Sequence, residues 1–501
     1  MLAEINLYSV QQSRDMDQLV INEYGIPAYE LMQRAALACF NIGLRLWPDA
    51  SNVIVLCGTG NNGGDGYLIA KRCLQHGLNV SVIQLGDIER QKGAALMARQ
   101  ALRKAGLTPM LYSPSAAIEQ KISSADIVYD ALLGTGLERE IAAPWKEMIL
   151  TLNRQAVPVI AVDIPSGLHA DTGIPLGASI TAHATVCLLS RKKGLYTGYA
   201  PQACGQIFFD DLGVSHKVYS MFTSHTQLLR ASCIQKIYQQ RTKVAHKGVY
   251  GHALLIGGDV GMAGSIHLAA QAALRSGAGL VSVITTKNHA VATSQAQPEL
   301  MCHAFPEAAN YQELETKASA IAIGPGLGFA RWGQMLFQKA LESKKIKIVD
   351  ASALTWLAQN VCKNDSWILT PHPGEAATLL GVTIAQIEAD RFAAATAIQI
   401  KYGGVCLLKG AGSIITDGHI NYVCPFGNPG MASGGMGDTL TGILVAVAAQ
   451  AKSKELSLVD IAAIGVTVHS LAADYAAKEG EHGMLASDVI QQIRRVINTR
   501  G

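Results

Sequence analysis

Short apolar runs alternate with longer amphipathic stretches along most of the chain. In the first half the runs are Val53–Cys57, Val80–Leu85, Asp126–Tyr129, Val157–Val162, Thr185–Leu189 and Gln206–Phe209. In the second half they are His252–Ile256, Leu280–Ile284, Ala320–Ile323, Ile346–Val349, Trp367–Leu369 and Val405–Leu408. Continuous apolar strands that alternate with helices are typical of a parallel sheet covered on both faces. The pattern therefore predicts the α/β fold class.

Three segments depart from this alternation. Residues Val10–Leu46 carry apolar side chains at helical spacing, and the break at Gly25-Ile26-Pro27 predicts two helices there. Between Gly213 and Gly248 the strand pattern stops and the sequence becomes polar. The run Ile414–Val423, with Asp417-Gly418 in its middle, predicts a β-hairpin. We therefore expect two domains, residues 1–217 and 228–501, joined by a linker at 218–227.

The composition narrows the class of protein. Hydrophobic residues make up 49% of the 501 residues and charged residues 16%, which suits large buried cores. A net charge of +3 gives no basic surface for nucleic acid or a membrane. The ten cysteines form no C-x-x-C pair, the N-terminus lacks a signal peptide pattern, and the most apolar run, Leu440–Ala449, is too short to cross a bilayer. We expect a cytoplasmic protein that acts on small molecules, and its apolar helices suit a homo-oligomer.

Three polar, glycine-rich segments follow predicted strands in the first half. They are Cys57–Gly66 (CGTGNNGGDG), Asp130–Leu137 (DALLGTGL) and Asp163–Gly167 (DIPSG). Ligands of open parallel sheets bind at the carboxyl ends of the strands. Acid and amide side chains at these ends suit a hydroxyl-bearing ligand and a hard cation. The side chains in question are Asn61, Asn62, Asp65, Asp130 and Asp163.

The same segments allow other interpretations. The G-x-G-x-x-G pattern of Gly58–Gly63 satisfies a dinucleotide fingerprint, and Asp87 lies where a ribose-binding acid is expected. An NAD-dependent oxidoreductase therefore stays open. Against it, Asp65 would compete with a pyrophosphate for the positive end of the helix. Tight turns explain the glycines equally, and Asp130 and Asp163 also suit a helix cap and a turn.

The second half carries its own candidate site at Gly427–Leu444 (GNPGMASGGMGDTLTGIL). Glycines before a helix point backbone N–H groups at a ligand and favour phosphate. Asp438 beside them suits a base that takes a proton from an attacking hydroxyl, although a helix N-cap gives the same pattern. A strand-end Lys-Gly turn suits nucleotide phosphates or ribose. His372 stands between two prolines, which hold it in an extended, preset loop, although a surface histidine in a turn is often inert. The other polar strand ends are Gly324–Gly328, Asp350, Thr370–Glu375 with His372, and Lys409–Ser413.

The first half resembles the NAD(P)H-hydrate epimerase family. CGTGNNGGDG, DALLGTGL and VDIPSG match in order and spacing over about residues 9–214, and the KKG at Lys192–Gly194 and the GQIFFDDLGV ending fit too. The resemblance implies a Rossmann-like sheet sandwich and epimerisation at C6 of hydrated nicotinamide, with Asp163 as our hypothesis for the proton-transfer group. It implies a potassium ion held by Asn62, Asp130 and Ser166. The implied substrate contacts are Asn61, Asn62, Gly63, Gly64, Asp65, Gly134, Thr135, Gly136, Leu137, Glu138, Arg139, Glu140 and Asp163.

The second half resembles the ADP-dependent NAD(P)H-hydrate dehydratase family over about residues 228–501. The matching motifs are HKGVYG, GGDVGMAG, GAGLVSV, GPGLG, VDASAL, TPHPGE, KGAGS and NPGMASGGMGDTL. The resemblance implies a ribokinase-like α/β sandwich. It also implies phosphate transfer from ADP to the C6 hydroxyl of hydrated NADH or NADPH, then elimination to NAD(P)H, AMP and phosphate. Magnesium is expected for such a transfer.

The dehydratase resemblance also assigns residues. The adenine nucleotide would be bound by Lys409, Gly410, Ala411, Gly412, Ser413 and Gly437. The hydrated dinucleotide would face Ser265, Gly326, Gly328, His372 and Asp438, the last of them as the catalytic base. The family usually has alanine where Ser265 stands, so a tight methyl contact there is in doubt.

Two other functions stay open from the residues. A small-alcohol kinase of the ribokinase-like type would consume ATP and release a stable phosphorylated product. A non-catalytic nucleotide-binding protein would bind ligand without turnover. The intact Asn-Asn-Gly-Gly-Asp and Gly-Met-Gly-Asp sets speak against the second of these.

Overall fold

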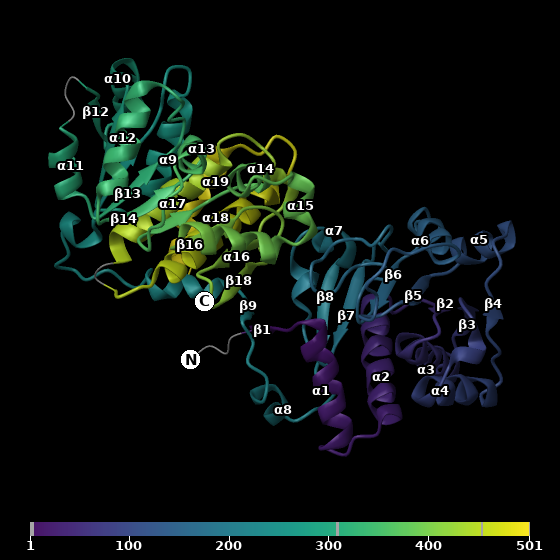
Figure 1. Ribbon diagram of the computed structural model, residues 1–501. Helices are drawn as coiled ribbons and strands as arrows, with labels where there is room; N and C mark the ends of the chain where they lie inside the picture. Colours follow the sequence, from purple (N-terminus) through teal and green to yellow (C-terminus); the bar gives the residue numbers. More distant parts are fainter. Residues whose placement is uncertain (1–4, 307–309, 452–453, 500–501) are drawn as a thin grey trace. The chain divides into compact units, whose positions relative to one another are not determined.

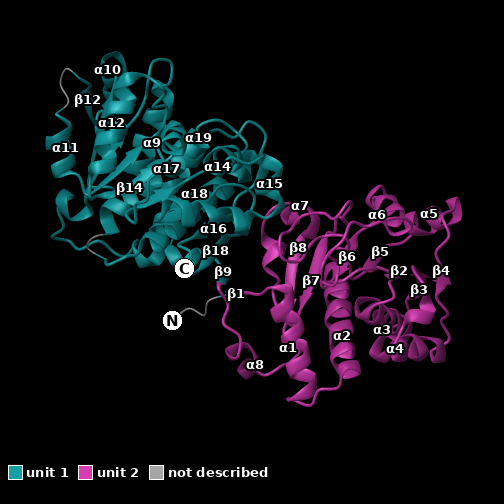
Figure 2. Cartoon of the chain, viewed as in Figure 1, with its two compact units in different colours: residues 1–5, 226–501 teal, residues 6–225 magenta. Residues whose placement is uncertain are grey.

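The computed structural model describes residues 5–306, 310–451 and 454–499. These residues form two compact units (Figure 2). The N-terminal unit consists of residues 6–225, and the C-terminal unit consists of residues 226–501 together with the start of the chain. Each unit has strands that alternate with helices, which confirms the α/β fold class.

Seven parallel strands build the sheet of the N-terminal unit, in the order β4-β3-β2-β5-β6-β7-β8 (Figure 1). The order reverses at β2, because β3 and β4 extend from one side of it and β5 to β8 from the other. Ligand crevices of such Rossmann-like sheets lie at the reversal point. The strands are β2 (Asn52–Cys57), β3 (Asn79–Gln84), β4 (Met110–Leu111), β5 (Ile127–Ala131), β6 (Val159–Val162), β7 (Ala184–Leu188) and β8 (Gln206–Asp210).

Helices cover both faces of this sheet, because its strands are apolar on both sides. Along β2, Val53 and Val55 pack into one core with residues of α1 to α4, whereas Ile54 and Leu56 pack into a second core with α5 and α6. Successive side chains of a strand point to opposite faces, so one apolar run serves both cores. The helices are α1 (Val10–Asn22), α2 (Ala28–Leu46), α3 (Asn61–Gln75), α4 (Gly93–Lys104), α5 (Ala116–Ser123), α6 (Trp145–Asn153), α7 (Ala200–Cys204) and α8 (His216–Ser220).

The sheet of the C-terminal unit has the order β1-β9-β18-β17-β16-β15-β14-β13-β10-β11-β12. It is parallel from β16 to β12, and β17 pairs antiparallel with both β16 and β18. The predicted hairpin at Asp417-Gly418 is confirmed. The strands are β1 (Ile5–Leu7), β9 (Thr226–Leu228), β10 (His252–Ile256), β11 (Leu280–Thr285), β12 (Met301–Ala304), β13 (Ala320–Ile323), β14 (Ile346–Val349), β15 (Trp367–Leu369), β16 (Val405–Leu408), β17 (Ser413–Thr416) and β18 (Asn421–Cys424).

Two apolar helices, α17 and α18, lie in the core of the C-terminal unit. The stretch Leu458–Glu479, which contains α18, is long and apolar enough to cross a membrane, but 72% of its most apolar window is buried inside the protein, as in the core helix of a globular unit. The helices are α9 (Ala263–Arg275), α10 (Lys287–Ala296), α11 (Tyr311–Lys317), α12 (Arg331–Glu342), α13 (Ser352–Gln359), α14 (Pro373–Leu380), α15 (Ile384–Ala389), α16 (Arg391–Tyr402), α17 (Met436–Ala451), α18 (Leu458–Ala476) and α19 (Ala486–Asn498).

Candidate active sites

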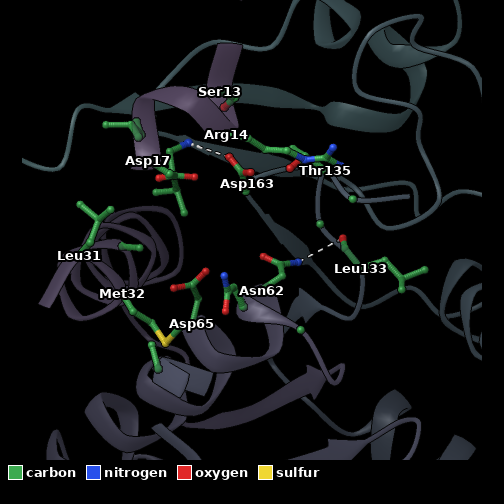
Figure 3. A pocket seen from close by; sticks show the side chains of 18 of the residues that line it. Ser13, Arg14, Asp17, Leu31, Met32, Asn62, Asp65, Leu133, Thr135 and Asp163 are labelled. Carbon is green, nitrogen blue, oxygen red and sulfur yellow. Dashed lines mark hydrogen bonds between the residues drawn. The ribbon is translucent and has the colours of Figure 1, made fainter. Parts of the chain in front are cut away.

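A cavity of about 820 Å³ opens in the N-terminal unit (Figure 3). The segments after β2, β5 and β6 line it together with side chains of α1 and α2. A cavity of this size accepts a ligand as large as a nucleotide. The predicted substrate contacts that line it are Asn61, Asn62, Asp65, Gly134, Thr135, Gly136, Leu137, Glu138, Arg139 and Asp163.

Asp163 forms an ion pair in this cavity with a buried lysine. The Lys192 side chain is only 2% exposed, and its ammonium donates to the Asp163 carboxylate and, over 2.8 Å, to the Leu188 carbonyl oxygen. The backbone N–H of Leu188 donates to the same carboxylate over 3.0 Å. Burial disfavours the Lys192 ammonium, but the charge and hydrogen bond of Asp163, together with the charges of Cys187 and Asp17, outweigh burial and raise the pKa of Lys192. The two groups are therefore a charged pair.

Two further carboxyl groups line the same cavity. Burial raises the pKa of Asp17 to about 6, with Lys192 opposing and Asp163 adding to the rise. Burial and the charges of Asp163 and Asp17 hold the pKa of Asp65 well above its usual range. The sequence motifs did not mark Asp17, because on α1 it follows the pattern of an ordinary amphipathic helix. The sequence marks Lys192 only as part of the KKG motif.

The predicted cation ligands form a buried cluster beside the cavity. Asp130 accepts hydrogen bonds from the Ser166 hydroxyl over 2.6 Å and from the Ser166 backbone N–H over 2.7 Å. The Asn62 amide donates to the Leu133 carbonyl oxygen over 3.2 Å, and the Ser166 hydroxyl oxygen lies 3.2 Å from the same carbonyl oxygen. Burial raises the pKa of Asp130 to about 6. Asp130 does not cap a helix here, and polar groups from the start of α3, from β5 and from the loops after β5 and β6 converge.

Some predicted residues lie outside the cavity lining. A Cβ on Gly63 would come 2.0 Å from the Gly58 carbonyl oxygen, so this glycine permits close packing of the loop on α3. Gly64 is packed against Met32, and Glu140 is exposed. Asp87 caps a short 3-10 helix by accepting from the Glu89 backbone N–H over 3.0 Å. Asp87, the acid that a dinucleotide fingerprint would use to bind ribose, therefore caps a neighbouring turn. This weakens the oxidoreductase interpretation.

In the C-terminal unit, five neighbouring parallel strands end in the predicted motifs. The strands are β16, β15, β14, β13 and β10, adjacent in this order. Because they are parallel, the segments that follow them meet at one edge of the sheet. These segments are Lys409–Ser413, Thr370–Glu375, Asp350, Gly324–Gly328 and Gly257–Gly264.

Lys409 is the centre of an acidic network at this edge. Its ammonium lies 2.8 Å from Asp350 and 3.5 Å from Glu375. Asp350 is 2% exposed and also accepts from the hydroxyls of Thr370 and Thr441, over 2.9 and 2.8 Å. Burial disfavours the Lys409 ammonium, but the two carboxylates outweigh it and raise its pKa. The lysine is therefore a fixed positive charge beside the predicted nucleotide loop.

Asp438 lies near this network, in the first turn of α17. It is the third residue of the helix, so the N-cap interpretation is wrong. Burial and the charge of Asp350 raise its pKa to about 6, while the Ser265 hydroxyl opposes the rise by a hydrogen bond. A Cβ on Gly437 would lie 3.4 Å from the Lys409 ammonium nitrogen, which places the nucleotide loop against the start of α17.

Two other residues shape the segments that follow β15 and β16. His372 caps α14, because its Nδ1 accepts from the backbone N–H groups of Gly374 and Glu375 over 3.0 and 3.4 Å. Arg391 is 1% exposed and donates to the Lys409 carbonyl oxygen over 3.0 Å. It holds the Lys409–Ser413 turn in place, and no motif marked it. Gly326 and Gly328 have φ values of +58° and +66°, a region that favours glycine.

The two sites define the class of protein: an α/β enzyme of two units, each with acidic side chains and an ion-paired lysine at the carboxyl ends of parallel strands. A family model described as NAD(P)H-hydrate dehydratase matches residues 253–495. One described as YjeF-related protein N-terminus matches residues 28–194. The fold of the C-terminal unit is shared with a ribokinase-like superfamily protein from Enterococcus faecalis at 28% identity and a TM-score of 0.50, over 55% of this chain and 96% of that one.

Relatives that match nearly the whole chain identify its family. The bifunctional NAD(P)H-hydrate repair enzyme of Coxiella burnetii is 43% identical over 98% of this chain and 99% of the relative. The enzyme of the same name from Escherichia coli is 40% identical over 95% of this chain and 90% of the relative. The chain belongs to the family of bifunctional NAD(P)H-hydrate repair enzymes.

Proposed function

We propose that this protein repairs hydrated NADH and NADPH. The N-terminal unit interconverts the R and S epimers. The C-terminal unit dehydrates the S epimer at the expense of ADP, giving NAD(P)H, AMP and phosphate. The observation that carries the proposal is the similarity to repair enzymes over nearly the whole chain, with the motif residues gathered at one site in each unit.

The C-terminal site supports phosphoryl transfer followed by elimination. Backbone N–H groups at the start of α17 and the Lys409 ammonium suit the nucleotide phosphates. Asp438 would take the proton of the C6 hydroxyl as it attacks, which converts the hydroxyl into a phosphate leaving group. Among the described residues, no group of three His, Cys, Asp or Glu side chains is arranged as a metal site. Magnesium would therefore arrive with the nucleotide phosphates.

The test of function uses purified protein and a mixture of the R and S epimers of hydrated NADH. Recovery of the near-ultraviolet absorbance of NADH is followed with ADP, with ATP and with neither. We expect full conversion of both epimers with ADP. Conversion that stops at one epimer would remove the epimerase from the proposal. A stable phosphorylated product formed from ATP would instead favour the kinase.

Potassium fits the buried cluster by the chemistry of its donors. Asp130 has hydrogen-bond donors around it but no cationic partner among the described residues. Hard cations take carboxylate, hydroxyl and carbonyl oxygens. We propose that Asn62, Asp130 and Ser166 hold the ion, which would neutralise the buried charge and fix the loop that continues to Gly134–Arg139 at the cavity.

Replacing Ser166 with alanine is expected to raise the potassium concentration needed for half-maximal epimerisation by roughly tenfold, because one ligand oxygen worth about 1.5 kcal/mol is lost. Potassium should also raise the unfolding temperature of the wild type more than that of the variant. Ser123→Ala, at the exposed end of α5, is the matched control. Equal potassium dependence of all three proteins would rule the site out.

Replacing Ser265 with alanine is expected to shift the acidic limb of the dehydration pH profile to higher pH. The Ser265 hydroxyl stabilises the ionised form of Asp438, so its loss raises the pKa of the base further above its present value of about 6. Since the base acts when ionised, the rate near neutral pH should fall while the plateau at higher pH is kept. An unchanged profile would mean that this hydrogen bond is not made in solution.

We also place the protein in a reducing cytosol. All ten cysteines are free and seven of them are buried. A homo-oligomer and the exclusion of nucleic acid stay predictions from the composition.

A further inference from the structure

Carboxyl groups reach the cavity of the N-terminal unit from two sides. In Figure 3, Asp65 points into the open space from α3, next to Asn62, whereas Asp163 and Asp17 lie across that space. Asp163 follows β6, and its carboxylate forms an ion pair with the ammonium of Lys192. A flat ring placed in the cavity would thus have one carboxyl group on each face.

The two facing groups have opposite environments. Asp163 forms an ion pair with the Lys192 ammonium and accepts a hydrogen bond from the Leu188 backbone N–H. Asp65 has no hydrogen bond or ion pair among the described residues, and burial and the charges of Asp163 and Asp17 raise its pKa. Titratable groups whose environments diverge in this way are suited to serve as acid and base of one reaction.

We propose that Asp65 and Asp163 transfer protons on opposite faces of the C6 centre, so that Asp65 is a second catalytic residue of the epimerase. The inference rests on the proposed epimerisation of hydrated NAD(P)H. The inference adds to the proposed epimerisation that Asp65 donates the proton to the leaving hydroxyl and that the C6–O bond is the bond that breaks.

Asp65 gives its proton to the C6 hydroxyl, the C6–O bond breaks, and water leaves while the lone pair of the ring nitrogen forms a C=N bond. A water molecule then adds to C6 from the other face. Asp163 takes one of its protons, and the electron pair returns to the ring nitrogen. One proton has moved from Asp65 to Asp163, and the enzyme in this state converts the opposite epimer or exchanges protons with solvent.

Asp17 and Lys192 complete the set of charged groups around the two residues. Lys192 can neutralise only one of the three acidic side chains near it, and its contact is with Asp163. Asp17 adds negative charge near Asp163 and contributes to keeping the proton on Asp65. Among the described residues Asp17 makes no hydrogen bond or ion pair with Asp65 or Asp163, so it acts on them only through its charge, as a positioning residue.

The first test follows the oxygen atom. The full-length protein, without nucleotide, is incubated with one epimer of hydrated NADH in water enriched in oxygen-18. The product epimer is then separated, and its molecular mass is measured by mass spectrometry. We expect each epimerised molecule to carry one solvent oxygen, above the exchange in protein-free controls. Retention of the original oxygen would overturn the proposal, because it would mean that C6 inverts by ring opening and not by loss of water.

The second test replaces Asp65 with asparagine. We expect kcat for epimerisation to fall by at least about a hundredfold while KM changes little, since the amide keeps the shape of the site but gives no proton. Asp49→Asn, an exposed position of the same unit, is the matched control. Wild-type kcat in Asp65→Asn would overturn the role of Asp65. If the wild type itself leaves both epimers unchanged, the proposed epimerase function fails instead.

Discussion

Replacing Asp438 with asparagine is expected to lower the rate of ADP-dependent dehydration by about a hundredfold to ten-thousandfold and to leave epimerisation at the wild-type rate. The carboxyl group lies in the first turn of α17, beside Gly437 and across from Lys409. Asparagine keeps its size and can still accept hydrogen bonds. It cannot accept the proton of the attacking hydroxyl, so phosphoryl transfer should stop while nucleotide binding persists.

The same residue sets the pH dependence of dehydration. Its pKa is raised to about 6 by burial and by the charge of Asp350. A general base acts in its ionised form, so kcat/KM should fall as the pH drops through about 6 and level off above it. The measurement is NADH recovery from the S epimer across this range, with Asp365→Asn, an exposed position of the same unit, as control. Retained dehydration in Asp438→Asn would assign the base elsewhere.

Local sequence predicted most of the fold because the strands are buried on both faces. Such strands are continuous apolar runs, and all twelve runs and the hairpin became strands. The strands that were missed are β1, β4, β9 and β12, each two to four residues long. Short strands such as Met110–Leu111, which is exposed, carry too few apolar positions for a pattern, and only their neighbours in the sheet define them.

The candidate sites were predictable where a loop carries both glycines and polar groups. The segments after β2, β5 and β6 reach one cavity because parallel strands share an edge. Asp17 and Arg391 were not predictable, since each reaches its site from a helix through contacts distant in sequence. The ion pair of Lys192 with Asp163 spans 29 residues and likewise has no local signal.

The largest effect on stability is expected from replacing Lys192 with methionine. The change removes a buried ammonium and leaves Asp163, which is 18% exposed, without its cation and with two carboxyl groups nearby. Removing one partner of a buried ion pair costs about 3–5 kcal/mol, because the remaining charge stays desolvated. The free energy of unfolding of the N-terminal unit should fall by this order, and epimerisation should be lost.

Hydrogen–deuterium exchange is the suitable measurement, because it reports on the peptides of each unit separately. Peptides of β7 around Leu188 should exchange faster in Lys192→Met, while those of the C-terminal unit should not change. The exposed Lys104→Met is the matched control. Wild-type protection in Lys192→Met would show that the pair does not stabilise the fold.

A double variant separates the charge effect from the loss of packing. In Lys192→Met with Asp163→Leu, no buried charge is left unpaired at this position, so much of the protection should return while epimerisation stays absent. The single and double variants can be compared with the wild type at neutral pH, because Lys192 of the wild type is fully charged there. The pKa of Lys192 is raised above 10.5 in the folded state, so its contribution is complete below that pH and is lost only as the pH rises through the folded pKa. If the double variant were no better protected than the single one, the cost would come from the cavity left by the lysine stem and not from the stranded carboxylate.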